Sequence, residues 1–173
     1  MQYPFTEEQL AMSDLVNDFM EKEVAPVAAE MDRSPDPKDC YPAELINKAS
    51  KLGIRTMAVP EEWGGAGADF VSYALALEEI AGGHAAASLY MSLNNSPNGL
   101  ALMKYGTDAQ KETFLRPSIQ GEMQAAFALT EPLAGSDAAN VRTTAEPTAD
   151  GTGYVLNGEK RWITNGGIAD VLT

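Results

Sequence analysis

Two short polar stretches in the last third of the chain have the residue types of a ligand-binding site. The first is Thr-Glu-Pro-Leu-Ala-Gly-Ser-Asp over residues 130–137, and it follows the apolar run 125–129. Such a run is typical of a buried strand, and the small residues after it let a ligand approach the backbone closely. The second is Lys-Arg-Trp-Ile-Thr-Asn-Gly-Gly over residues 160–167. Strand alternation would put Trp162 and Thr164 on one face, where an indole and a hydroxyl suit a large planar heteroaromatic ligand.

The composition of the chain argues against several classes of function. The formal net charge of −13 disfavours binding to nucleic acid or to an anionic membrane, since both require a basic surface. His84 is the only histidine, so Ser-His-Asp or Cys-His catalysis would have to be built on that residue. Cys40 is the only cysteine, so we expect no intrachain disulfide and no metal site. The sequence shows neither a targeting segment nor a membrane-spanning run, and we expect a cytoplasmic protein.

The first two-thirds of the sequence have the pattern of a helical domain. Residues 6–9 and 107–110 both read Thr-x-x-Gln, a capping box that marks the start of a helix. Apolar residues recur at helical spacing after the first box, and Gly or Pro interrupts the pattern at intervals. The first predicted helix starts at the box at 6–9, has apolar positions as far as Val27, and precedes a loop expected at 33–39. The other predicted helices cover residues 42–53, 69–83, 85–102 with a disturbance near Pro97, and 107–116 with a stop before Pro117.

The pattern changes to β from Gln124 onward. We expect strands over 125–130 and 141–146, and the start of another over 169–173. Asn157-Gly158 lies between 154–156 and 161–164 and is a strong signal for a β-hairpin. The chain is therefore predicted to be α+β, with an all-α orthogonal helical bundle in residues 1–122 and antiparallel strands in residues 123–173.

In combination, the two polar stretches resemble the flavin-binding signature of the acyl-CoA dehydrogenases. The resemblance extends along the whole chain, because Thr-Glu-Glu-Gln at 6–9, Leu-Gly at 52–53, Pro-Glu-Glu-Trp-Gly-Gly at 60–65 and Tyr-Gly-Thr at 105–107 follow in family order. It implies that residues 123–173 begin an antiparallel β-barrel-like middle domain. It also implies that the family's C-terminal four-helix domain is absent from this chain.

The resemblance carries specific roles over to matching positions. The first stretch and its strand would bind the polar edge of FAD, and the second would pack on the flavin face away from the substrate. Ser136 would also lie near the thioester of the acyl-CoA. The cofactor-binding residues implied in this way are Phe127, Leu129, Thr130, Gly135, Ser136, Trp162, Ile163 and Thr164.

The implied reaction is α,β-dehydrogenation of an acyl-CoA in fatty-acid β-oxidation. A glutamate removes the α proton, the β hydrogen leaves as a hydride to FAD, and an electron-transfer flavoprotein takes the electrons. The glutamate lies in the family's C-terminal domain, so we expect no catalytic base in this chain; Glu131 is interpreted as structural. The complete enzyme would be a homo-oligomer, the family tetramer. Two alternatives remain open: an acyl-CoA oxidase, and a non-catalytic helical scaffold that retains the fold.

Overall fold

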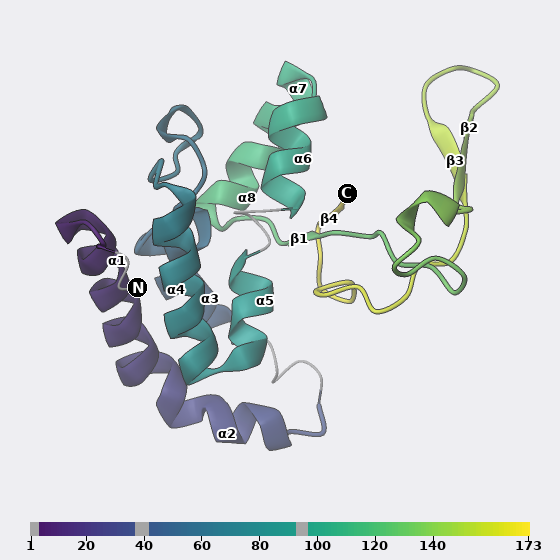
Figure 1. Ribbon diagram of the computed structural model, residues 1–173. Coiled ribbons are helices and arrows are strands. Elements are labelled where there is room, and N and C mark those ends of the chain that lie inside the picture. The colour runs from purple at the N-terminus through teal and green to yellow at the C-terminus, as the bar shows by residue number, and fades with distance from the viewer. Residues whose placement is uncertain (1–3, 37–41, 93–96) are drawn as a thin grey trace.

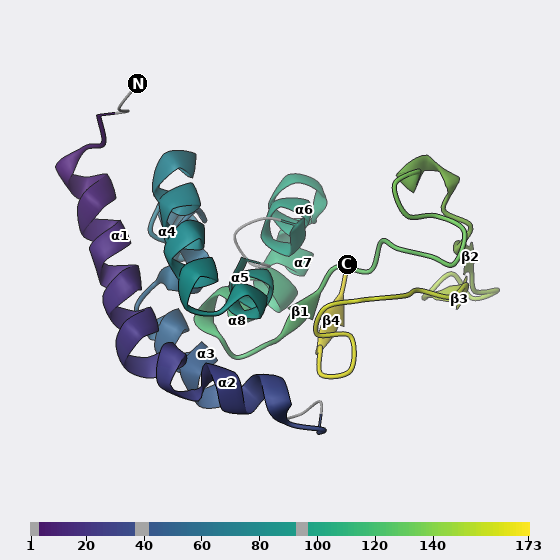
Figure 2. The same ribbon diagram turned by 60° about the horizontal axis from the view of Figure 1, so that its bottom comes forward.

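Helices and strands occupy separate parts of the computed structural model, which describes residues 4–36, 42–92 and 97–173 (Figure 1). The helices pack together up to Gln120, and short strands follow from Ala125. The segment after β1 runs away from the helices to a projecting hairpin, and both views show this separation (Figure 2). The predicted α+β class, a helical domain followed by a β part, is confirmed.

The N-terminal helical segment is continuous but bent between α1 and α2 (Figures 1 and 2), and it consists of α1 (Glu7–Phe19), the π-helical η1 (Met20–Val24) and α2 (Ala25–Arg33). The predicted capping box opens it, since the Thr6 hydroxyl accepts from the backbone N–H of Gln9 at 3.2 Å and the Gln9 side chain accepts from the Thr6 N–H at 3.0 Å. Pro26 lies in the first turn of α2, directly after the π-helical segment. A π turn changes which carbonyl each N–H bonds to, from residue i−4 to residue i−5. The helix can therefore continue past Pro26, which has no N–H to donate.

The remaining helices of the bundle begin and end largely where their local signals predict. They are α3 (Ala43–Lys51), η2 (Ile54–Thr56), η3 (Glu61–Trp63), α4 (Phe70–Gly83), α5 (Ala85–Ser92) and α6 (Pro97–Tyr105). Gly53 ends α3 with a φ of 76°, and the Asp69 carboxylate caps α4 by accepting from the N–H groups of Val71 and Ser72. The predicted helix over 85–102 is divided into α5 and α6, and its residues 93–96 lie outside the described part.

One predicted helix end is wrong. The last helical segment consists of α7 (Asp108–Gln110), the π-helical η4 (Lys111–Leu115) and α8 (Arg116–Gln120), so the helix continues through Pro117 instead of stopping before it. Pro117 lies in the first turn of α8, again directly after a π-helical segment. The N-terminal helix has the same arrangement, with the π-helical η1 before the turn that contains Pro26.

The hydrophobic core lies between α1, η1, α3, α4 and α5, with α1 and α4 side by side in both views (Figures 1 and 2). Its most deeply buried members are Val16, Met20, Val24, Ile46, Ala49, Ala76, Ala87 and Met91. A second, smaller cluster joins Val59 to Leu115 and Ile119 of the last helical segment. Trp63, at the start of the glycine-rich turn 63–67, packs against this second cluster.

The β part contains two small sheets among the described residues. Strand β1 (Ala125–Ala126) pairs with β4 (Val171–Leu172), and β2 (Thr144–Pro147) pairs with β3 (Tyr154–Asn157); η5 (Ala138–Asn140) is a single 3₁₀ turn. The β2–β3 pair is antiparallel, as predicted, whereas β1 and β4 run parallel. Residues 127–170, 44 in all, separate β1 from β4. A connection of this length lets the chain cross over and pair with β1 in the same direction.

The predicted hairpin around Asn157-Gly158 is wrong. Strand β3 forms its hairpin with the preceding strand, β2, and not with the residues that follow it. The turn of this hairpin covers residues 148–153, in which Gly151 has a φ of 68°. Residues 161–164 form no strand. At Gly158 the backbone passes so close to Thr143 that a Cβ would lie 2.2 Å from the threonine hydroxyl. The chain therefore continues past β2 after Gly158 instead of turning back along β3.

A matched pair of glycine substitutions tests the packing of the glycine-rich turn 63–67. A Cβ on Gly65 would lie 2.0 Å from the carbonyl oxygen of Val59, and we expect Gly65→Ala to destabilise the fold by roughly 1–3 kcal/mol or more. A Cβ on Gly82 in α4 meets nothing within 4 Å, so Gly82→Ala should stabilise by about 0.5–1 kcal/mol through helix propensity. Urea unfolding of both variants measures the difference, and equal stabilities would contradict the packing described for the turn.

Candidate functional site

The first polar stretch leaves β1 as an irregular segment with unused hydrogen-bond donors. Phe127 and Thr130 are half-buried, and Leu129 is exposed. The predicted strand 125–130 is reduced to two residues. The pairing continues beyond them where the Thr173 N–H donates to the Ala126 carbonyl at 3.0 Å and the Ala128 N–H donates to the Thr173 carbonyl at 2.7 Å. Within the described residues, the N–H groups of Leu129 and Thr130 and the Thr130 hydroxyl have no partner. These donors are available to a ligand with acceptor atoms.

Trp162 is the most unusual residue of the second stretch. Its side chain is 88% exposed, and its φ of 59° lies in the left-handed region that non-glycine residues rarely adopt. The expectation that strand alternation aligns Trp162 with Thr164 is therefore wrong, because this segment is a turn and not a strand. Ile163 and Thr164 are half-buried beside it. An exposed indole on a constrained turn has the chemistry of a stacking surface for a planar ligand.

Hydrogen bonds to backbone carbonyls join the second stretch to the first stretch and to the strand before it. The Arg161 N–H donates to the Thr130 carbonyl at 2.9 Å, and the Lys160 ammonium donates to the Leu129 carbonyl at 3.2 Å. Asn165, which also has a left-handed φ of 64°, reaches the Ala125 carbonyl at 3.5 Å. The structure thus joins the segment of Thr130 to the segment of Trp162.

Gly135 and Ser136 lie apart from that junction. Both are exposed on the loop beyond Glu131, and no hydrogen bond in the described part of the chain ties them to residues 160–164. A Cβ on Gly135 would meet nothing within 4 Å, so the chain itself leaves the space around this glycine open. Neutral small residues on an open loop can be approached by a bulky ligand.

Glu131 is the buried carboxylate of the site, only 7% exposed. It accepts from the Arg142 N–H at 2.6 Å, the Thr143 N–H at 3.0 Å, the Thr143 hydroxyl at 2.5 Å and the Lys160 ammonium at 2.8 Å. The hydrogen bond from Lys160, then those from Thr143 and Arg142, lower the pKa of Glu131 from 4.5 to about 2. With four donors on it and so low a pKa, this carboxylate is a poor general base near neutral pH.

Lys160 and Thr143 are the residues of the site that the sequence did not single out. Lys160 stands in the second stretch, but a lysine next to an arginine is more often a solvated surface residue. Its side chain is only 27% exposed and bridges two segments some 30 residues apart in sequence. No periodicity or spacing marks such a long-range contact, since Glu131 and Lys160 meet only once the chain has folded.

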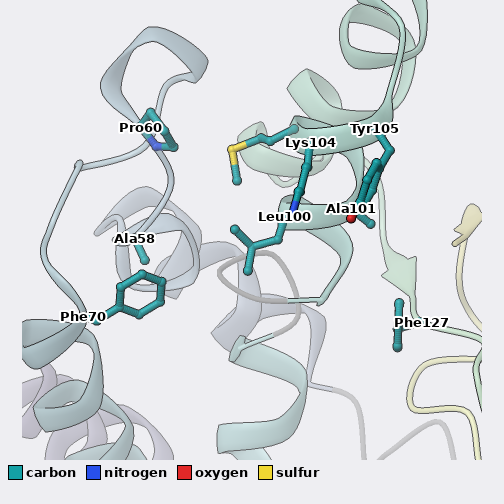
Figure 3. Close-up of a pocket in the computed structure, with 9 residues that line it drawn as sticks. Ala58, Pro60, Phe70, Leu100, Ala101, Lys104, Tyr105 and Phe127 are labelled. Carbon is teal, nitrogen blue, oxygen red and sulfur yellow. The ribbon is translucent and has the colours of Figure 1, made fainter. Parts of the chain in front are cut away.

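An apolar hollow of about 740 Å³ lies between the helical domain and the end of β1 (Figure 3). Phe70 and the turn at Pro60 form one wall and α6 forms another, while Phe127 extends from the β part (Figure 3). Lys104 is the only charged residue among its lining residues, which are Ala58, Pro60, Phe70, Leu100, Ala101, Met103, Lys104, Tyr105 and Phe127. Phe127 therefore connects the candidate flavin strand to a surface suited to apolar groups.

Within the described ranges, no three His, Cys, Asp or Glu side chains converge as ligands for a metal ion. None of the helices in the same ranges combines the length and the apolar character needed to cross a membrane.

The contacts of Glu131 generate a pH prediction. Because folding lowers its pKa, the ionised carboxylate stabilises the folded state fully above about pH 4.5, and this stabilisation is lost as pH falls through about 2. The wild-type chain should therefore be more stable than Glu131→Gln at pH 6, and the difference should shrink between pH 4.5 and 2. Denaturant unfolding of both chains across this range measures it; a pH-independent difference would show that the carboxylate's charge contributes nothing.

The comparisons with known proteins agree with the signature. The family model described as acyl-CoA dehydrogenase, N-terminal domain, matches residues 6–122, and the one described as acyl-CoA dehydrogenase, middle domain, matches residues 126–173. Among curated relatives, the 3-(aryl)acrylate reductase of Clostridium sporogenes is 43% identical over 96% of this chain and 42% of its own length. The human mitochondrial short-chain specific acyl-CoA dehydrogenase is 45% identical over 86% of this chain and 34% of its own length.

Solved structures give the same family. Butyryl-CoA dehydrogenase from Megasphaera elsdenii superposes with a TM-score of 0.85 at 41% identity, over 99% of this chain and 44% of that chain. An acyl-CoA dehydrogenase from Bacillus anthracis, solved with FAD, gives a TM-score of 0.87 at 37% identity, over 97% of this chain and 29% of that chain. The chain thus spans less than half the length of these relatives. By sequence and by fold, it belongs to the acyl-CoA dehydrogenase family.

Proposed function

We propose that this chain is the front portion of a flavin-dependent enzyme that dehydrogenates an acyl-CoA thioester between its α and β carbons. The observation that carries the proposal is the junction of Thr130 with the turn of Trp162, where free donors lie beside an exposed indole. A flavin needs both, because its ring is planar and one edge carries acceptor atoms. The named relatives, which include a butyryl-CoA dehydrogenase and a family member solved with FAD, support the same reaction class.

The residues present fit FAD. The N–H groups of Leu129 and Thr130 and the Thr130 hydroxyl would donate to the polar edge of the ring, and donors at this edge favour negative charge on the reduced flavin. Trp162 would stack on one face, with Ile163 and Thr164 beside it. Phe127 and Gly135 would border the cofactor, and Ser136 would lie near the thioester. When bound, FAD supplies the acceptor for the hydride.

Proton abstraction would require a residue other than the two carboxylates nearest the signature. Glu131 is held by four donors. Asp137 is exposed on the loop that would border the flavin's edge. Since the α proton and the β hydride leave from opposite sides of the acyl chain, a base on the flavin side has the wrong geometry. The base therefore belongs to polypeptide outside this chain in our proposal.

Three further features belong to the same proposal. Residues 1–122 would be the helical domain and 123–173 the first part of the β domain. An electron-transfer flavoprotein would accept the electrons, which is supported by a 37% identical neighbour from a study of that protein in Acidaminococcus fermentans. The complete enzyme would be a homo-oligomer in the cytoplasm. Oxygen consumption during turnover would instead indicate an acyl-CoA oxidase.

The stacking role of Trp162 can be tested in the full-length protein that contains these residues. Stacking of a heteroaromatic base on an aromatic side chain contributes roughly 1–3 kcal/mol, so Trp162→Ala should weaken FAD binding about tenfold or more. Thr164→Ala should weaken it less, and Trp162→Phe should retain most of it. Titration of the apoprotein with FAD gives the dissociation constants; an unchanged constant and an unshifted flavin spectrum in Trp162→Ala would reject the assignment, and a wild-type protein that binds no flavin would favour the scaffold.

The position of the base can be tested on the isolated 173-residue chain, verified by intact mass. We expect no turnover with a panel of acyl-CoA thioesters and an artificial electron acceptor, because neither Glu131 nor Asp137 is placed to remove the α proton. Turnover that disappears in Glu131→Gln and persists in Asp137→Asn would instead identify Glu131 as the base.

A further inference from the structure

Three segments far apart in the sequence meet at the carboxylate of Glu131. The segment 129–131 supplies the carboxylate, Arg142 and Thr143 supply two N–H groups and a hydroxyl, and Lys160 supplies its ammonium. None of these residues lies in a strand or a helix. Hydrogen bonds that converge on one carboxylate, and not a β ladder, therefore join these segments.

Lys160 is the member that reaches both halves of the candidate flavin site. Its ammonium lies 2.8 Å from Glu131 Oε1 and 3.2 Å from the carbonyl oxygen of Leu129. The next residue, Arg161, donates its N–H to the Thr130 carbonyl at 2.9 Å, and Trp162 follows immediately. The direction of the Leu129 carbonyl, and hence of the Thr130 N–H in the same planar peptide group, is coupled to the turn that carries Trp162.

We propose that the Glu131–Lys160 pair is a positioning clamp that sets the distance and angle between the donors of Thr130 and the indole of Trp162. The clamp rests on the proposed flavin function and assigns roles to two residues that would not themselves touch the flavin. It has a physical basis in the burial of the pair, with Glu131 at 6% and Lys160 at 27% side-chain exposure. A charge pair shielded from water keeps its geometry better than one on the surface, where screening and side-chain freedom weaken it.

The neighbouring ion pair provides a matched control. Arg161 Nε lies 3.0 Å from Glu159 Oε1, but these side chains are 50% and 65% exposed. Glu159→Gln therefore removes an ion pair from the same segment without touching Glu131, Thr130 or the left-handed turn. Lys160→Met removes the ammonium from the clamp and keeps an unbranched apolar chain, and Lys160→Arg retains the charge.

The experiment uses the full-length protein that contains these residues, in FAD-loaded and flavin-free forms. We expect Lys160→Met to raise the dissociation constant of FAD about tenfold and to change the visible circular dichroism of the bound flavin, which reports the ring's surroundings. Lys160→Arg should restore part of both signals, and Glu159→Gln should leave both unchanged. Glu131→Asp keeps the charge but shortens its reach by one methylene, so it should shift the dichroism in the same sense and provides the test if Lys160→Met does not fold.

Hydrogen exchange of the flavin-free protein gives a readout that does not depend on the cofactor. The Arg161 amide should exchange faster in Lys160→Met than in wild type, because its bond to Thr130 loses support. The clamp is overturned if the variant keeps the wild-type FAD affinity and dichroism. If the wild-type protein itself binds no FAD, the proposed flavin function fails first and the positioning role fails with it, so the two failures are distinguishable.

Discussion

The ionised carboxylate of Glu131 is the contact on which the β part of the molecule depends. The two described sheets contain only two and four residue pairs, so ladder hydrogen bonds alone cannot organise some fifty residues. A buried carboxylate that accepts from four donors compensates, because hydrogen bonds to a charged group are stronger than those between neutral groups. It also explains where β2 begins. The N–H groups of Arg142 and Thr143 point to Glu131, so the ladder starts only at Thr144.

The helical domain was largely predictable because its signals are local. The capping boxes at Thr6 and Thr107, the left-handed Gly53 and the cap at Asp69 each act within four residues of the feature that they determine. The exception is Pro117, where the local rule that a proline ends a helix gave the wrong helix end. A proline normally ends a helix, but a π turn before it changes which carbonyl faces the missing N–H. Nothing in the local composition distinguishes a π turn from an α turn.

The candidate site was predictable in its residue types and not in its geometry. Residues 130–137 and 160–167 do meet, through Thr130 and Arg161, but the segment of Trp162 is a left-handed turn and not a strand. The Asn157-Gly158 signal favoured a hairpin that would have used residues 161–164 as a strand. Tertiary contacts of Lys160 with Glu131 and Leu129 outweighed that local preference. Side chains that contact distant segments therefore decided the path of the chain where the strand signals were weakest.

Charged and neutral residues have separate tasks in this arrangement. Glu131 and Lys160 neutralise each other in a largely buried pair, while the neutral indole of Trp162 is exposed and the N–H groups of Leu129 and Thr130 have no partner among the described residues. The contacts that make Glu131 a good anchor also lower its pKa to about 2, and this removes it as a base near neutral pH. A flavin held only by neutral donors would be tuned by dipoles instead of by a nearby net charge. Holding the segments together is thus the task of the charged pair, whereas contact with the cofactor falls, in our proposal, to neutral residues of the same two stretches.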